Sequence, residues 1–260
     1  DLDIIVIYDS PSLEAQSWFT RVTQRLITAL TAPTAEGALY EVDMRLRPSG
    51  RGGPVAVSRS AFELYQNEEA WTWEHMALTR LRYVTGDAGL GADVMSIAKA
   101  AIADRASKDT GKIAQDISDM RLRLNQEKPG KGLWDLKTEK GGLIDIEFIV
   151  QREMLLNGEA KVIWSNTGQA LTAVTEAGNL SEQEGAALQD ALAYLQALQQ
   201  VQRLAVGSEM TVDEIPDGLK DRLCRAVHED SFHALERHLA TLKSSVHAIA
   251  VEKLQLPATD

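Results

Sequence analysis

From about residue 89 to the end of the chain, apolar residues recur at the spacing of amphipathic helices almost without interruption. The clearest example follows a capping box formed by Ser181 and Glu184. Its apolar stripe consists of Leu188, Leu192, Leu195, Leu198 and Val201. This periodicity predicts an all-α helical bundle over residues 89–260. The expected helices cover residues 89–106, 110–126, 142–157, 166–177, 181–206, 216–228 and 231–254.

The first 88 residues carry strand patterns instead. The apolar run Ile4–Tyr8 and the alternating run Glu41–Arg47 predict two strands. A helical pattern from Ser12 to Ala32 lies between them, and Pro33 ends it. Its apolar stripe consists of Leu13, Trp18, Val22, Leu26 and Leu30. We therefore expect a small domain of strands and helices over residues 1–88, followed by the helical bundle over residues 89–260.

Acidic residues stand at matching places on the two expected strands. Side chains alternate between the faces of a strand, so Asp1 and Asp3 point the same way. One face of the second strand carries only charged residues: Glu41, Asp43, Arg45 and Arg47. If the strands are neighbours in a sheet, Asp1, Asp3 and Asp43 converge, and a divalent cation is the usual neutralising partner of such a group. An Asp-x-Asp at a strand start is common, and it is the second strand that favours a metal-dependent nucleotide site.

This pattern assigns chemical roles. Asp1 and Asp3 would hold a nucleotide-bound metal, and Asp43 would complete the site and assist deprotonation of the acceptor. Arg45 and Arg47 fit phosphate clamps, because a guanidinium offers two parallel donors. The alternative for each arginine is an ion pair with Asp43 or Glu41.

Three further motifs each have a structural and a functional interpretation. The run Gly50–Gly53 fits a turn between strands better than a phosphate cradle. The pair Trp71 and Trp73 is expected to anchor a helix to the core or to an interdomain surface. In the block 134–148, Asp145 suits the first turns of a helix through the helix dipole, whereas the functional interpretation places Lys137 and Asp145 at the active cleft.

The composition excludes several classes of protein. The net charge of −11 disfavours a nucleic-acid substrate, because phosphate binding needs a basic face. The single cysteine, Cys224, allows no internal disulfide, and no apolar run is long enough for a membrane span, so we expect a cytoplasmic protein. The histidines at 228, 233 and 238 are spaced by five and predict no metal set. The chain begins with Asp inside a motif, which suggests a fragment of a longer protein.

Four segments together carry a family resemblance. They are Asp-Leu-Asp-Ile-Ile at 1–5, Val-Asp-Met-Arg-Leu-Arg-Pro-Ser-Gly at 42–50, Asn-Glu-Glu-Ala-Trp-Thr-Trp-Glu-His at 67–75, and Asp-Leu-Lys…Gly-Gly-Leu-Ile-Asp-Ile-Glu-Phe at 135–148. The combination resembles glutamine synthetase adenylyltransferase, a bacterial enzyme that attaches AMP to, and removes it from, a tyrosine of glutamine synthetase. The third segment resembles the adenylylating, carboxy-terminal copy of its two nucleotidyltransferase domains. The Gly-Ser that precedes Asp-x-Asp in the family, and that would contact the triphosphate, is absent here.

The resemblance implies an α+β fold, with a polymerase-β-like nucleotidyltransferase domain followed by an all-α bundle. It implies ATP as substrate, Mg²⁺ or Mn²⁺ as cofactor, glutamine synthetase as protein substrate, and control by the PII signal protein and glutamine. It assigns metal binding and catalysis to Asp1, Asp3 and Asp43, and nucleotide contacts to Arg45, Arg47 and Lys137. Three alternatives remain: the deadenylylating copy, a docking module without chemistry, and an RNA nucleotidyltransferase, which the acidic charge disfavours.

Overall fold

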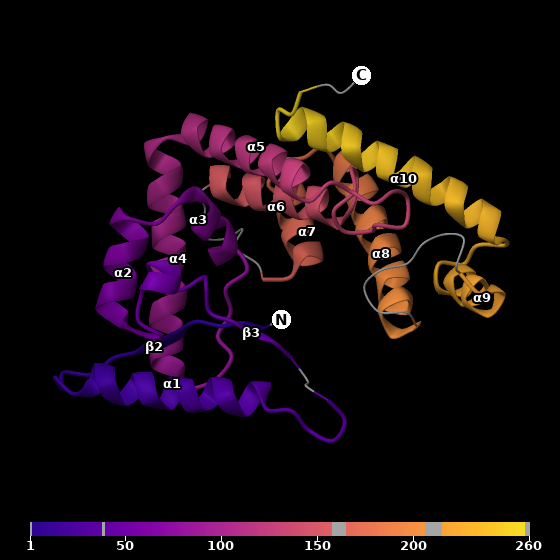
Figure 1. Cartoon of the computed structure of the whole chain (residues 1–260). Coiled ribbons are helices and arrows are strands. Elements are labelled where there is room, and N and C mark those ends of the chain that lie inside the picture. The colour runs from indigo at the N-terminus through magenta and orange to yellow at the C-terminus, as the bar shows by residue number, and fades with distance from the viewer. Residues whose placement is uncertain (1, 38–39, 158–164, 206–214, 258–260) are drawn as a thin grey trace. The chain divides into compact units, whose positions relative to one another are not determined.

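The computed structural model describes residues 2–37, 40–157, 165–205 and 215–257 (Figure 1). The chain divides into two compact units, Asp1–Lys108 and Asp109–Asp260. The first ends with helix α4 (Ala88–Lys108), which the periodicity had grouped with the bundle. The structure groups α4 with the first unit because α4 packs on α2 (Arg59–Glu68) and α3 (Thr72–Leu78).

Short parallel strands form the centre of the first unit. Strand β1 (Leu2–Asp3) pairs with β3 (Val42–Asp43), and β2 (Val6–Tyr8) pairs with β4 (Ala56–Ser58). Helix α1 (Ala15–Thr31) supplies the crossover that a parallel pair requires. With the helices, these strands confirm an α+β chain, and they confirm that the two acidic strands are neighbours.

The expected strand Glu41–Arg47 is wrong beyond its first half, because β3 ends at Asp43. The Asp43 carboxylate accepts a hydrogen bond from the backbone N–H of Arg45 at 2.8 Å. This is the contact of an Asx-turn, in which a side chain replaces a backbone acceptor and redirects the chain. Arg45 and Arg47 therefore lie on a turn and do not share a strand face with Asp43.

The glycine-rich segment after β3 is not a hairpin. It forms the short 3₁₀ helix η1 (Gly50–Gly52), and the chain then resumes alongside β2 as β4. Ser49 and Gly50 have positive φ angles of 60° and 51°. At Gly53 a Cβ atom would lie 2.0 Å from the Pro48 carbonyl oxygen, so the loop requires glycine there.

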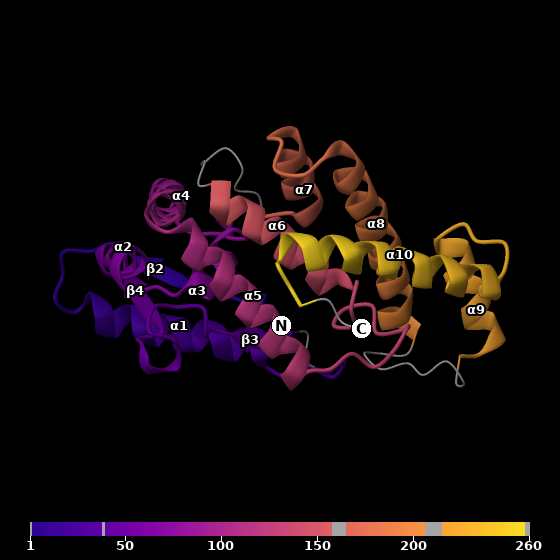
Figure 2. The same ribbon diagram turned by 90° about the horizontal axis from the view of Figure 1, so that it is seen from above.

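The second unit is a bundle in which α6 occupies the centre. Helix α6 packs against α5, α7, α8 and α10, and α10 (yellow in Figures 1 and 2) also packs on α8 and α9. The bounds are α5 (Thr110–Glu127), α6 (Leu143–Asn157), α7 (Thr167–Glu176), α8 (Glu182–Ala205), α9 (Asp217–Ala226) and α10 (Phe232–Lys253). The predicted helices are confirmed to within a few residues. No described helix is both long and apolar enough to cross a membrane.

Candidate metal and nucleotide site

Asp3 and Asp43 face each other across the β1–β3 pair. They are direct register partners, and the strands are held by hydrogen bonds from Leu2 N to Glu41 O at 2.7 Å and from Ile4 N to Asp43 O at 2.9 Å. Because neighbouring strands lie about 4.8 Å apart and register partners point the same way, the two carboxylates share one small region. The predicted convergence of Asp3 and Asp43 is therefore present. Asp1 lies outside the described residues.

The Arg45 guanidinium binds Asp43. Arg45 Nε donates to Asp43 Oδ2 at 2.6 Å, and a second guanidinium nitrogen contacts the same oxygen. These hydrogen bonds hold the pKa of Asp43 below its usual range, although its burial acts in the opposite direction. Asp43, and more weakly the charge of Asp3, raise the pKa of Arg45. Of the two interpretations of Arg45, the ion pair is the one that forms in this structure.

Arg47 has a different environment. Its side chain is buried, and its Nη1 and Nε donate to the carbonyls of Met44 at 2.5 Å and Gly53 at 3.3 Å. These two hydrogen bonds link Met44 before η1 to Gly53 after it, and so they stabilise the turn that contains η1. The sequence did not indicate this role, because it placed Arg47 on a strand face.

The donor set suits a hard divalent cation. Asp3 and Asp43 provide carboxylate oxygens, which Mg²⁺ prefers, and the ion pair with Arg45 shows that the Asp43 carboxylate can hold a positive charge. Among the described residues no group of three or more metal-ligating side chains gathers. The two carboxylates therefore fit a site completed by phosphate oxygens or water, as is usual for Mg²⁺.

Two residues of the Asn67–His75 motif, Glu74 and His75, stabilise the first unit through buried hydrogen bonds. Glu74 is buried, accepts from the backbone N–H of Trp71 at 2.9 Å and from the Tyr65 hydroxyl at 2.9 Å, and so caps α3. His75 is also buried, and its Nε2 lies 3.0 Å from the Gln66 carbonyl. Burial lowers the pKa of His75. The expectation that both tryptophans pack in the core is wrong, because Trp71 and Trp73 are exposed by 68% and 41%; their packing on an interdomain surface stays a prediction.

The two other candidate residues belong to the second unit. Lys137 is exposed on the loop before α6, so its relation to Asp3 and Asp43 stays a prediction. Asp145 is 1% exposed, and it accepts from Arg121 Nε and from the backbone N–H of Gly141, both at 2.6 Å. Burial alone would raise the pKa of Asp145, but His247 and Arg121 hold it below the usual range. Asp145 is therefore the buried counterion of Arg121, a partner that the helix-dipole interpretation did not identify.

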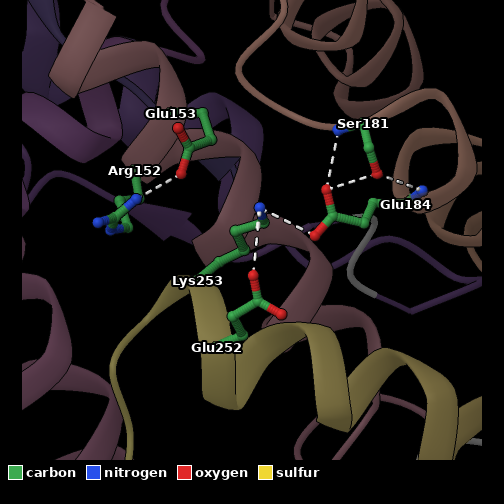
Figure 3. Close-up of polar contacts among 6 residues, drawn as sticks. All are labelled: Arg152, Glu153, Ser181, Glu184, Glu252 and Lys253. Carbon is green, nitrogen blue, oxygen red and sulfur yellow. Dashed lines mark hydrogen bonds and ion pairs between the residues drawn. The ribbon is translucent and has the colours of Figure 1, made fainter.

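Another group of charged residues in the second unit comes from α6, α8 and α10 (Figure 3). Lys253 Nζ lies 2.9 Å from Glu184, whose other oxygen accepts from the backbone and hydroxyl of Ser181 at 2.8 Å. Glu153 pairs with Arg152 at 2.5 Å, and burial raises the pKa of Glu153. The capping box is confirmed. Because these acids have partners inside the bundle, the cluster is explained by packing.

Comparisons with known proteins match both units. The family model described as glutamate-ammonia ligase adenylyltransferase matches residues 1–97. The family model described as PII-uridylyltransferase matches residues 114–254. The two matches thus follow the two-unit organisation closely.

Curated relatives align with nearly all of the chain. Proteins named bifunctional glutamine synthetase adenylyltransferase/adenylyl-removing enzyme are 43% identical in Agrobacterium fabrum, 41% in Rhizobium meliloti and 40% in Mesorhizobium japonicum. The alignments cover 95%, 96% and 95% of this chain, but only 26% of each relative. The chain therefore spans about a quarter of the length of the relatives it matches.

Proposed function

Because this chain belongs to the glutamine synthetase adenylyltransferase family, we propose that it transfers AMP from ATP to a tyrosine hydroxyl of glutamine synthetase. The observation that carries the proposal is the register pair Asp3–Asp43, of which Asp43 already binds the cationic side chain of Arg45. Parallel strands fix this pair, so the two acids do not depend on a mobile loop for their placement. The short mixed helix–strand unit is proposed to be polymerase-β-like.

The proposed roles follow from the environment of each side chain. Asp3 and Asp43, with Asp1 as a further ligand, would bind Mg²⁺ or Mn²⁺, which supplies charge neutralisation on the phosphates when bound. Asp43 is also placed to accept hydrogen bonds, as its contact with Arg45 demonstrates, and it would favour loss of the tyrosine proton.

Three basic residues are proposed to act on the nucleotide. Arg45 and Lys137 are exposed and would contact its phosphates. Arg47 would act through the turn that it fastens, by keeping the backbone of η1 in place beside the phosphates.

The longer protein's partners belong to the same proposal. The second unit matches a PII-uridylyltransferase model, which supports control by the PII signal protein. Glutamine is proposed as an effector, and the cytoplasm as the location. A nucleic-acid substrate stays disfavoured by the net charge of −11.

Incubation of the chain with unmodified glutamine synthetase, ATP and Mg²⁺, followed by intact-mass and peptide mass spectrometry, tests the proposal. We expect an AMP adduct on one tyrosine, and its loss in Asp3→Asn and Asp43→Asn. A matched control is Asp93→Asn, an exposed acid in the same unit. The proposal fails if no adduct forms, or if both carboxylate variants retain full transfer.

The removal of AMP is the second candidate, because the relatives are named for both activities. A parallel reaction with adenylylated glutamine synthetase and inorganic phosphate distinguishes them. Phosphate-dependent release of ADP without any forward transfer would assign the adenylyl-removing reaction to this chain.

A further inference from the structure

The Arg45 side chain occupies the Asp43 oxygen that the proposed metal would use, and its side-chain contacts among the described residues are with Asp43. Its side chain is 62% exposed, whereas that of Asp43 is 13% exposed. The contacts between them use both carboxylate oxygens of Asp43: Oδ1 accepts from the Arg45 backbone N–H at 2.8 Å, and Oδ2 accepts from the guanidinium at 2.6 Å. A metal ion could reach Oδ2 only after the guanidinium had left.

We propose that Arg45 is a built-in counterion that competes with the divalent cation for Asp43 and leaves when metal binds, so that it sets the metal concentration the site requires. This inference rests on the proposed function, since it concerns the same carboxylates. The backbone bond to Oδ1 is separate from the guanidinium and can persist in both states, so the Asx-turn would keep Asp43 in place during the exchange.

The charges around Asp43 support replacement of the Arg45 guanidinium by a divalent cation, rather than a permanent ion pair between Arg45 and Asp43. The carboxylates of Asp3 and Asp43 both act on the single Arg45 guanidinium, so one cation faces two acids. A divalent ion neutralises such a pair fully, whereas a guanidinium leaves one negative charge. After release, the planar guanidinium has the geometry to bind a phosphate with two parallel hydrogen bonds.

Arg51 provides a matched control for the effect of charge alone. Its positive charge also lowers the pKa of Asp43, but it makes no hydrogen bond to that carboxylate among the described contacts. Arg51→Gln and Arg45→Gln therefore remove the same charge from the same turn. Only the second variant removes the group that occupies Asp43 Oδ2.

The experiment is a Mn²⁺ titration of the nucleotide-free chain, with bound metal measured by electron paramagnetic resonance. Because the Arg45 side chain is largely exposed and solvent screens its ion pair, we expect Arg45→Gln to bind Mn²⁺ about fivefold more tightly. Arg51→Gln should bind like the unmodified chain, within about threefold, and Arg45→Gln with Asp43→Asn should lose the gain. Circular dichroism verifies that each variant is folded.

A second readout follows Arg45 itself. In nuclear magnetic resonance spectra, addition of Mg²⁺ should move the Arg45 Nε–H signal toward that of a solvated guanidinium. The inference is overturned if Arg45→Gln binds Mn²⁺ no more tightly than Arg51→Gln, or if the Nε–H signal does not change at saturating Mg²⁺. If neither the unmodified chain nor any of the variants binds Mn²⁺, the proposed metal site itself is refuted.

Discussion

Replacement of Arg121 by Met would isolate the most deeply buried charge in the second unit. Arg121 and Asp145 are each 1% exposed and are joined at 2.6 Å. Removal of one partner of a buried ion pair leaves an uncompensated charge and costs about 3–5 kcal/mol. For a unit of this size, each kcal/mol lowers the melting temperature by about 2–4 °C, so we expect a decrease of roughly 6–20 °C.

The double variant separates an ion pair from simple packing. Asp145→Asn removes the charge but keeps an oxygen that can accept from the backbone N–H of Gly141. The double variant Arg121→Met with Asp145→Asn should therefore recover at least about half of the lost stability, because neither position then carries an unpaired buried charge. Arg123→Met, at an exposed position on the same helix, is the control and should change little.

Differential scanning calorimetry of the whole chain gives the measurement, since separate transitions would reveal which unit is affected. A decrease below about 2 °C for Arg121→Met would refute the argument that the pair stabilises the bundle. The same conclusion would follow if the double variant were no more stable than Arg121→Met. If Asp145→Asn lost AMP transfer without any change in melting temperature, the result would instead support the interpretation that places Asp145 at the active cleft.

Three further outcomes test individual contacts. Gly141→Ala should cost at least about 2 kcal/mol in urea unfolding, because φ is +74° and the new Cβ would lie 1.9 Å from the Lys243 carbonyl oxygen; Gly132→Ala, in open space, should cost less. Burial raises the pKa of Glu153, so the contribution of Glu153 to stability is lost as pH rises from about 4.5 through the raised pKa; the melting temperature of Glu153→Gln should therefore depend less on pH over this range than that of the unmodified chain. Burial lowers the pKa of His75 below 6.5, so the unfolded state takes up the extra proton and stability falls as pH drops below 6.5; His75→Gln should flatten melting profiles between about pH 5 and 7.

The helices of the second unit could be predicted from the sequence because each one buries a stripe that is continuous along the chain. The stripe on α8 illustrates this, since Leu188, Leu195 and Leu198 are fully buried at the predicted spacing. The apolar stripe of α1 is not buried in this way. Trp18, Val22 and Leu26 are exposed, and the helix instead buries Ala15 and Thr23, because periodicity shows a face but not what covers it.

The candidate site could be predicted only in part. The two acidic strands are neighbours, which is the condition that the sequence analysis set for the convergence of Asp3 and Asp43. Alternation along each strand shows the shared face of the acids but not which strand lies beside it. The end of β3 could not be foreseen, since it depends on a side chain that captures a backbone N–H two residues later. The role of Glu74 and the Arg121–Asp145 pair likewise depend on contacts between separate elements, which a local pattern does not contain.

The most direct test of the metal–nucleotide site is calorimetric titration of the chain with ATP, with and without Mg²⁺, repeated for Asp43→Asn. Asp3 and Asp43 are register partners and are proposed to share one metal ion, so we expect ATP to bind only with Mg²⁺, and binding to be lost in the variant. Equal affinity for ATP without Mg²⁺, or unchanged binding by Asp43→Asn, would contradict the assignment of this carboxylate pair.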